Sequence, residues 1–132
     1  MNTTVLHLLD TLRAHLAAFE LPELYSVQVI MASGQPRVTM HLAAHHPSQI
    51  VTGLLTWSGT LSHVTAEAWR EPGGQAVHLS VTGRLAKDVT IRVYGALPLT
   101  PHGPGADLAP NASATMPLTA LRYFVTPDEV IS

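Results

Sequence analysis

The sequence contains no cysteine. It therefore offers no disulfide framework, no thiolate nucleophile and no zinc site built on sulfur. No apolar run approaches the roughly 18 residues that a membrane-spanning helix needs, so we expect no membrane association. The first residues lack the basic region of a secretory signal, and the apolar run at 5–9 is broken by His7, so we expect a cytoplasmic protein.

Charge is also scarce, because only 12% of the residues are charged and the formal net charge is -2. The seven basic residues are spread from Arg13 to Arg122 without a cluster, which is not the composition of a nucleic-acid-binding protein. Hydrophobic residues make up 46% of the chain, so it should fold rather than stay disordered. A surface this poor in charge favours self-association or a protein partner.

The length of 132 residues predicts a single domain, 1–132, with one core. A second helix is expected at about 47–58, with Pro47 suited to its first turn and Gly59 as its stop. A first helix is expected at 4–19, where steps of four and three form one stripe of an amphipathic helix: Val5, Leu9, Leu12, Leu16 and Phe19.

Alternating apolar and polar residues predict two strands on either side of a turn at 33–36, and three more strands after the second helix. The order α-β-β-α-β-β-β indicates an α+β fold, in which a roughly five-stranded antiparallel sheet carries both helices on one face. The expected strands cover 25–31, 38–42, 64–69, 77–81 and 89–94.

Prolines and glycines crowd the segment 97–117, which we interpret as a loop. A structureless stretch of about 20 residues is uncommon inside a compact domain, so this loop should pack along the surface, move, or be ordered by a partner. The segment 117–124 is expected to be a short helix with an apolar side made of Leu118, Leu121, Tyr123 and Phe124.

The other face of the predicted sheet is polar, so it should be exposed or meet another molecule. Trp69 and Tyr94 fall on this side, where large aromatic residues are typical anchors of protein interfaces. The alternative is that the C-terminal segment folds over this face and buries them. The interface candidates are Trp69, Tyr94, Arg92, Glu67 and His78.

Eight histidines are many for this length, and His41, His45 and His46 fall close together. Histidine is the commonest metal ligand, but no carboxylate lies near these three in the sequence, so we expect exposed or helix-capping histidines and no metal site. His63 and His78 face each other across a strand pair only in one register of the sheet.

Catalytic motifs are absent: there is no Gly-x-Ser-x-Gly, phosphate loop, dinucleotide glycine fingerprint or EF-hand loop. Glu67 and Glu71, with Arg70 between them, are interpreted as solvated surface. We therefore expect no catalytic residue and no cofactor. This expectation disfavours an enzyme.

Four stretches carry a resemblance: 64–70 (VTAEAWR), 77–85 (VHLSVTGRL), 93–95 (VYG) and 105–110 (GADLAP). They are similar to small uncharacterised proteins of actinomycete (Streptomyces-type) genomes, and the likeness covers most of the chain from Leu24 onward. The resemblance implies a bacterial, cytoplasmic protein and brings no activity or catalytic residue with it.

Two hypotheses for the function follow from the polar face. The first is a non-enzymatic interaction or regulatory module, a homodimer that associates through the polar sheet face or an edge strand. The second is a small-molecule binding or catalytic domain with its site between the sheet and the 97–117 loop. The polar contributors to that site would be His78, Glu67 and Arg92.

A third hypothesis is nucleic-acid binding, which the overall composition disfavours. It depends on four cationic side chains, and it requires them to share one surface. These are Arg70, Arg84, Lys87 and Arg92.

Overall fold

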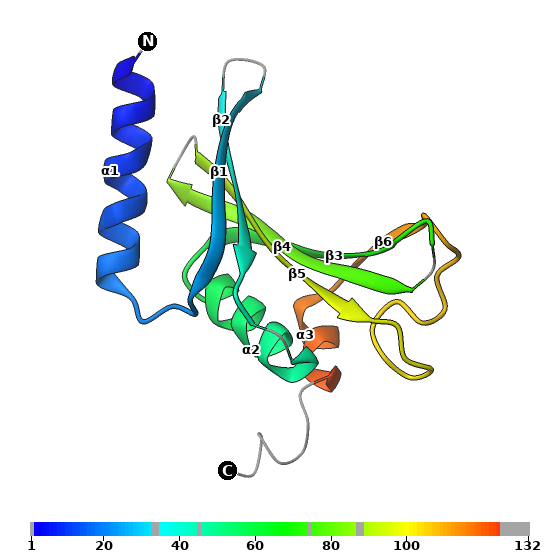
Figure 1. Cartoon of the computed structure of the whole chain (residues 1–132). Helices are drawn as coiled ribbons and strands as arrows, with labels where there is room; N and C mark the ends of the chain where they lie inside the picture. The colour runs from blue at the N-terminus through cyan, green and yellow to red at the C-terminus, as the bar shows by residue number, and fades with distance from the viewer. Residues whose placement is uncertain (1, 33–34, 45, 74, 87–88, 125–132) are drawn as a thin grey trace.

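The computed structural model describes residues 2–32, 35–44, 46–73, 75–86 and 89–124, and they form a mixed α+β fold (Figure 1). The predicted fold class is therefore confirmed. The strands are β1 (Leu24–Ala32), β2 (Gln35–Leu42), β3 (Ser62–Arg70), β4 (Ala76–Ala86), β5 (Val89–Pro98) and β6 (Ser113–Met116). The helices are α1 (Asn2–Ala18), α2 (Pro47–Ser58), α3 (Leu118–Leu121) and the 3-10 turn η1 (Arg122–Phe124).

The sheet has six strands in the order β1-β2-β5-β4-β3-β6. Every neighbouring pair is antiparallel except β2 and β5, which are parallel. The prediction of a five-stranded, wholly antiparallel sheet was therefore wrong in two details. Alternation within a strand indicates which face each residue occupies but carries no information on which strand lies beside it, so the parallel pair left no local signal.

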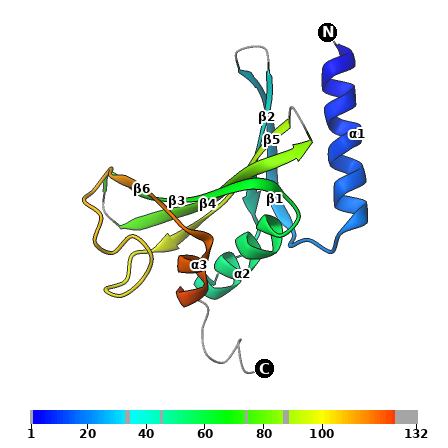
Figure 2. The ribbon, with the colours of Figure 1, turned by 180° about the vertical axis from the view of Figure 1, so that it is seen from behind.

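The sixth strand lies within the segment 97–117 that was interpreted as a loop. It has four residues and pairs with β3, with Thr115 opposite Glu67. A strand this short, with one β-branched residue, is held by its partner rather than by its own composition. The remainder of the segment, 99–112, is irregular and returns the chain from β5 to the far edge of the sheet (Figure 2).

Helix α2 packs on one face of the sheet and forms the centre of the core (Figures 1 and 2). Its observed bounds match the predicted ones: Pro47 opens its first turn, and the backbone N–H of Gly59 donates to the Leu55 carbonyl at 3.1 Å. The predicted C-terminal helix is also present as α3 and η1, and its Leu121 is 1% exposed. The buried residues of α2 are Ile50, Val51, Gly53, Leu54 and Trp57.

Helix α1 docks through a different face from the one its apolar spacing indicates. Leu8 and Leu12 are buried, whereas Leu9, Leu16 and Phe19 are 45%, 39% and 47% exposed. The prediction that this stripe faces the core was therefore wrong. The buried face of α1 is rotated from it, and the two faces share Leu12. Leucines stand on more than one side of this helix, so periodicity alone could not select the buried side.

His15 explains the choice of face. Its ring stacks on Trp57 with centroids 5.8 Å apart, and its Nε2 lies 2.8 Å from Thr60 Oγ1. The Thr60 hydroxyl donates its hydrogen to the Trp57 carbonyl at 2.9 Å, so its oxygen accepts from the Nε2–H of His15. Burial of the ring lowers the pKa of His15 below its ordinary value of 6.5.

This burial predicts that acid weakens the fold. The folded chain disfavours protonation of His15, so the unfolded chain binds that proton more tightly and the free energy of unfolding falls as pH drops below 6.5 towards the lowered pKa. Thermal unfolding between pH 7.5 and 5 should show a smaller acid-dependent loss in His15→Gln than in the wild type. His7→Gln, at an exposed position on the same helix, is the matched control, and an equal loss in all three proteins would contradict the assignment.

The contact between α2 and β5 predicts a second effect on stability. A Cβ at Gly95 would lie 2.6 Å from Cγ2 of the buried Ile50, whereas a Cβ at Gly73 would meet nothing within 4 Å. We expect Gly95→Ala to lower the free energy of unfolding by about 1–3 kcal/mol through overpacking, and Gly73→Ala to change it little. Urea denaturation of both variants measures this, and equal midpoints would refute the close approach of α2 to β5.

Candidate functional site

Five rings cross the polar face of the sheet in one line. They come from adjacent strands, and their neighbours lie within stacking or edge-to-face distance. His41 stacks on Tyr94 with ring centroids 4.6 Å apart, Tyr94 lies 6.0 Å from His78, and His78 meets Trp69 at 5.0 Å. Tyr25 extends the line by an edge contact with His41 at 5.4 Å. We call Tyr25, His41, Tyr94, His78 and Trp69 the aromatic row.

The register of the strands produces this row. His41 on β2 is the partner of Tyr94 on β5, and Trp69 on β3 is the partner of His78 on β4. The indole Nε1–H of Trp69 also donates to Asn111 Oδ1 at 3.3 Å. Trp69 is therefore held between the sheet and the loop before β6, and it is partly rather than fully exposed.

Glu71 meets the aromatic row at His78 through a hydrogen bond between their side chains. Its Oε1 lies 2.7 Å from His78 Nε2, and the two side chains are 38% and 23% exposed. The interpretation of Glu71 as plain solvated surface was wrong, because the turn after β3 folds its carboxylate back onto β4. Glu71 and His78 stand seven positions apart, so no local signal in the sequence indicated this pairing.

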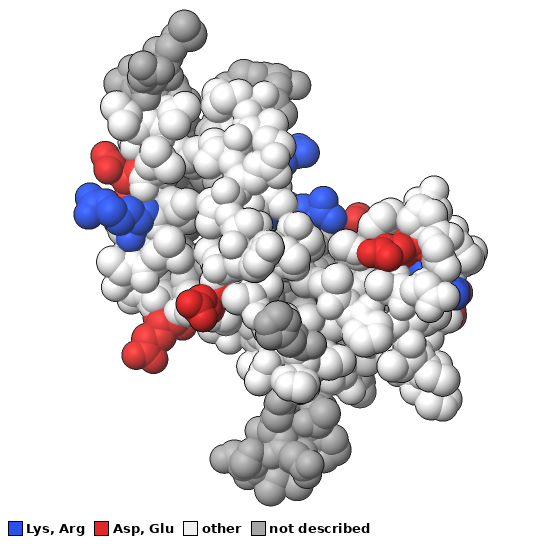
Figure 3. Space-filling view, viewed as in Figure 1, with Lys and Arg blue, Asp and Glu red and all other residues white. Residues whose placement is uncertain are grey.

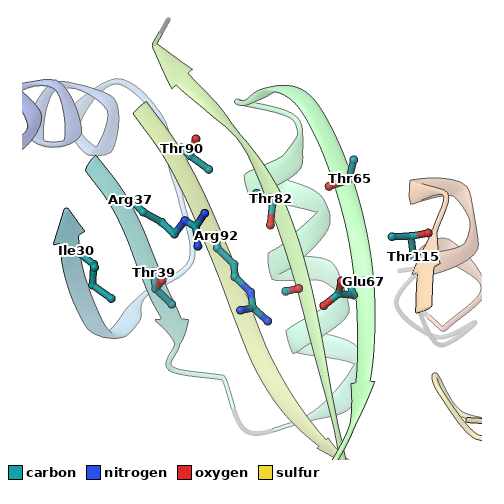
Figure 4. Close-up of a pocket in the computed structure, with 10 residues that line it drawn as sticks. Ile30, Arg37, Thr39, Thr65, Glu67, Thr82, Thr90, Arg92 and Thr115 are labelled. Carbon is teal, nitrogen blue, oxygen red and sulfur yellow. The ribbon is translucent and has the colours of Figure 1, made fainter. Parts of the chain in front are cut away.

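A hollow of about 450 Å³ lies next to the aromatic row on the same face (Figure 4). We call it the polar hollow. Each of its lining residues lies on a strand of the sheet, and none comes from a loop. Its lining residues are Ile30, Arg37, Thr39, Thr65, Glu67, Ser80, Thr82, Thr90, Arg92 and Thr115.

Two arginines from adjacent strands face this hollow. Arg37 on β2 is the partner of Thr90, and Arg92 on β5 is the partner of Thr39, so the two arginines are diagonal neighbours on one face. Within the part of the chain that the structure describes, neither guanidinium makes a hydrogen bond or an ion pair. The sequence analysis missed Arg37, although its alternation with Thr39 and His41 placed it on the polar side.

The five interface candidates lie together on the polar face. Trp69, Tyr94 and His78 belong to the aromatic row, while Glu67 and Arg92 line the polar hollow. The C-terminal helix packs on the opposite, core side, where Leu121 is buried. The described C-terminal residues, 118–124, therefore do not cover the two large aromatic residues, and 125–132 lie outside the described residues.

The nucleic-acid candidates do not share one surface. Arg84 is exposed, and its partner Thr90 puts it on the same face as Arg92. Arg70 is the partner of the buried Val77 and donates to the Leu108 carbonyl, so it belongs to the core side. Lys87 lies outside the described residues.

The histidines that the structure describes form no cluster that could hold a metal. Among the described residues there is no group of three or more potential ligands, and His45 lies outside them. His46 precedes α2 and makes no side-chain capping bond. His63 has a positive φ of 53° at an irregularity of β3 and does not face His78, whose partner is Trp69.

The loop before β6 borders a second hollow, on the other side of the sheet from the polar one. Gly105 and Leu108 of this loop pack near Val77, which is buried on the core side. The second hollow, also about 450 Å³, is mainly apolar and is lined by residues that include Pro98, Pro101 and Phe124. Of the residues that line the polar hollow, Thr115 alone comes from 97–117, and it is the cross-strand partner of Glu67.

An uncharged flank forms the β1 side of the molecule. β1 is an edge strand that pairs with β2, and its nine residues include no charged side chain. Tyr25, Val27, Ile30 and Met31 are 77%, 45%, 44% and 47% exposed. Helix α1 runs beside this end of the sheet (Figures 1 and 2), and in Figure 3 the blue and red atoms on this side of the molecule lie over α1 and below it, whereas the surface over β1 is white.

Family models, curated proteins and solved structures show no match to this chain. Within the described ranges, no helix is long and apolar enough to cross a membrane. Functional reasoning therefore depends on the polar face and the uncharged flank themselves.

The aromatic row predicts unequal contributions from its two tyrosines. Tyr94 lies between two histidine rings, whereas Tyr25 meets one ring and is 77% exposed. We expect Tyr94→Ala to lower the free energy of unfolding by about 1–3 kcal/mol and Tyr25→Ala by less than about 1 kcal/mol. Chemical denaturation of both variants is the measurement, and a larger loss for Tyr25→Ala would contradict the observed stacking.

Proposed function

We propose that this chain is a non-enzymatic protein-interaction module that self-associates through β1, so that two copies join their sheets edge to edge. The observation that carries the proposal is the edge of β1, which is long, uncharged and without a neighbour on its outer side among the described residues. Such an edge presents a row of backbone donors and acceptors to another strand.

Features that usually protect an edge are scarce in β1. Natural edge strands carry lysine, proline or inward charges, or they are very short. β1 has nine residues and no proline or charge, and its one irregularity falls at its start, between Leu24 and Ser26. β6, at the other edge, has four residues. β1 is therefore the edge better suited to strand addition.

A second copy is the partner that β1 fits. Antiparallel pairing about a two-fold axis places the same strand on both sides, so any charged residue would lie near its own symmetry mate. The absence of charge from β1 removes that repulsion. On the core side of β1, Val27 and Met31 are 45% and 47% exposed, so a second copy would bury apolar surface there.

Light scattering coupled to size-exclusion chromatography tests this proposal. The wild type should have twice the chain mass of 14.1 kDa. Val27→Lys should raise the dissociation constant of the dimer at least about tenfold, because each dimer carries the new charge twice. Far-UV circular dichroism of Val27→Lys checks that the variant is folded.

Ala114→Lys is the matched control, because it adds the same charge to an exposed position on β6. It should leave the dimer intact. A wild-type protein of 14.1 kDa at every concentration overturns the proposal. A dimer that persists in Val27→Lys but dissociates in Ala114→Lys would place the interface at β6 and would contradict the proposal.

A further inference from the structure

We propose that the polar hollow binds a small polyhydroxylated anion, of the chemical class of a sugar phosphate or sugar acid, with its anionic group at Arg37 and Arg92. The hollow lies on the polar face rather than at the edge of β1, so this site is independent of the proposed self-association. Its volume of about 450 Å³ falls in the range of small-molecule sites, roughly 300–1,000 Å³.

The two arginines suit an anionic ligand. A guanidinium carries donors and no acceptor, and its fork matches the oxygens of a phosphate or carboxylate. Arg37 and Arg92 stand diagonally on adjacent strands, and no acceptor among the described residues binds either one. Figure 4 shows both side chains extending over the same part of the sheet, with Arg92 directed to the side where Glu67 lies.

Ser80 adds a hydroxyl to the floor of the polar hollow. The residue as a whole is 3% exposed, but its oxygen stays accessible from the hollow and makes no hydrogen bond within the described part of the chain. A hydroxyl both donates and accepts, so Ser80 can bind a polar molecule seated there.

The rest of the lining selects a hydroxylated ligand. Threonine hydroxyls flank Arg92 from both neighbouring strands, through Thr39 and Thr82. Glu67 on the far side accepts hydrogen bonds from hydroxyl or amino groups when ionised. The lining includes one aliphatic residue, Ile30, and no aromatic ring, which disfavours a planar base as the main contact.

Isothermal titration of the purified chain with ribose 5-phosphate, inorganic phosphate and ribose tests the site. Ribose 5-phosphate should bind more tightly than phosphate, and ribose should bind least. Arg92→Gln and Arg37→Gln should each weaken ribose 5-phosphate at least about tenfold, the effect of losing a charge-assisted contact. Arg13→Gln, which removes an exposed arginine of α1, should leave binding unchanged. The dimer-disrupting Val27→Lys should also bind normally.

Three results would overturn the assignment. The first is that neither ribose 5-phosphate nor phosphate binds at millimolar concentration. The second and third are that ribose 5-phosphate binds no more tightly than ribose, or no more tightly than phosphate. An equal loss in Arg13→Gln and Arg92→Gln would show general charge attraction instead of a site. Binding of single-stranded RNA with none of the small anions would assign the face to a nucleic acid.

Discussion

The parallel pairing of β2 with β5 is the contact on which the rest of the structure depends. It joins the β1-β2 hairpin to the strands that follow α2, and it sets the register between them. Through this one pairing Arg37 comes to lie beside Arg92, and His41 stacks on Tyr94. The chain from β2 to β5 runs through α2, β3 and β4, and α2 approaches β5 closely at Gly95. A parallel pair needs such a covering connection, since a tight turn cannot link its strands.

Local patterns of the sequence were sufficient for the elements that local forces determine. Proline at the start and glycine at the end bounded α2, and the period-two alternation separated the buried and polar sides of each strand. Three features escaped because tertiary contacts decide them. The β2–β5 pairing depends on the whole fold, β6 depends on β3, and the docked face of α1 depends on the stacking of His15 on Trp57.

The candidate site divides in the same way. Trp69, Tyr94, Glu67, Arg92 and His78 share the polar face because alternation within their own strands puts them there. The gathering of Arg37 with Arg92 depends on pairing between distant strands. The hydrogen bond between Glu71 and His78 depends on how one turn folds back. A sequence therefore predicts which residues share a face of the sheet. It does not predict which of those residues lie next to one another.

The two proposed interactions use different parts of the same sheet and are compatible. Strand addition at β1 consumes the outer backbone edge and the apolar surface on the core side, where Val27 and Met31 lie. The polar hollow stays open, because nine of its ten lining residues come from strands other than β1. Ile30 is the exception, and it is the partner of Arg37 across the hairpin. This pair is where β1 meets the polar hollow, so a change in β1 on self-association would reach the anion site first at Arg37.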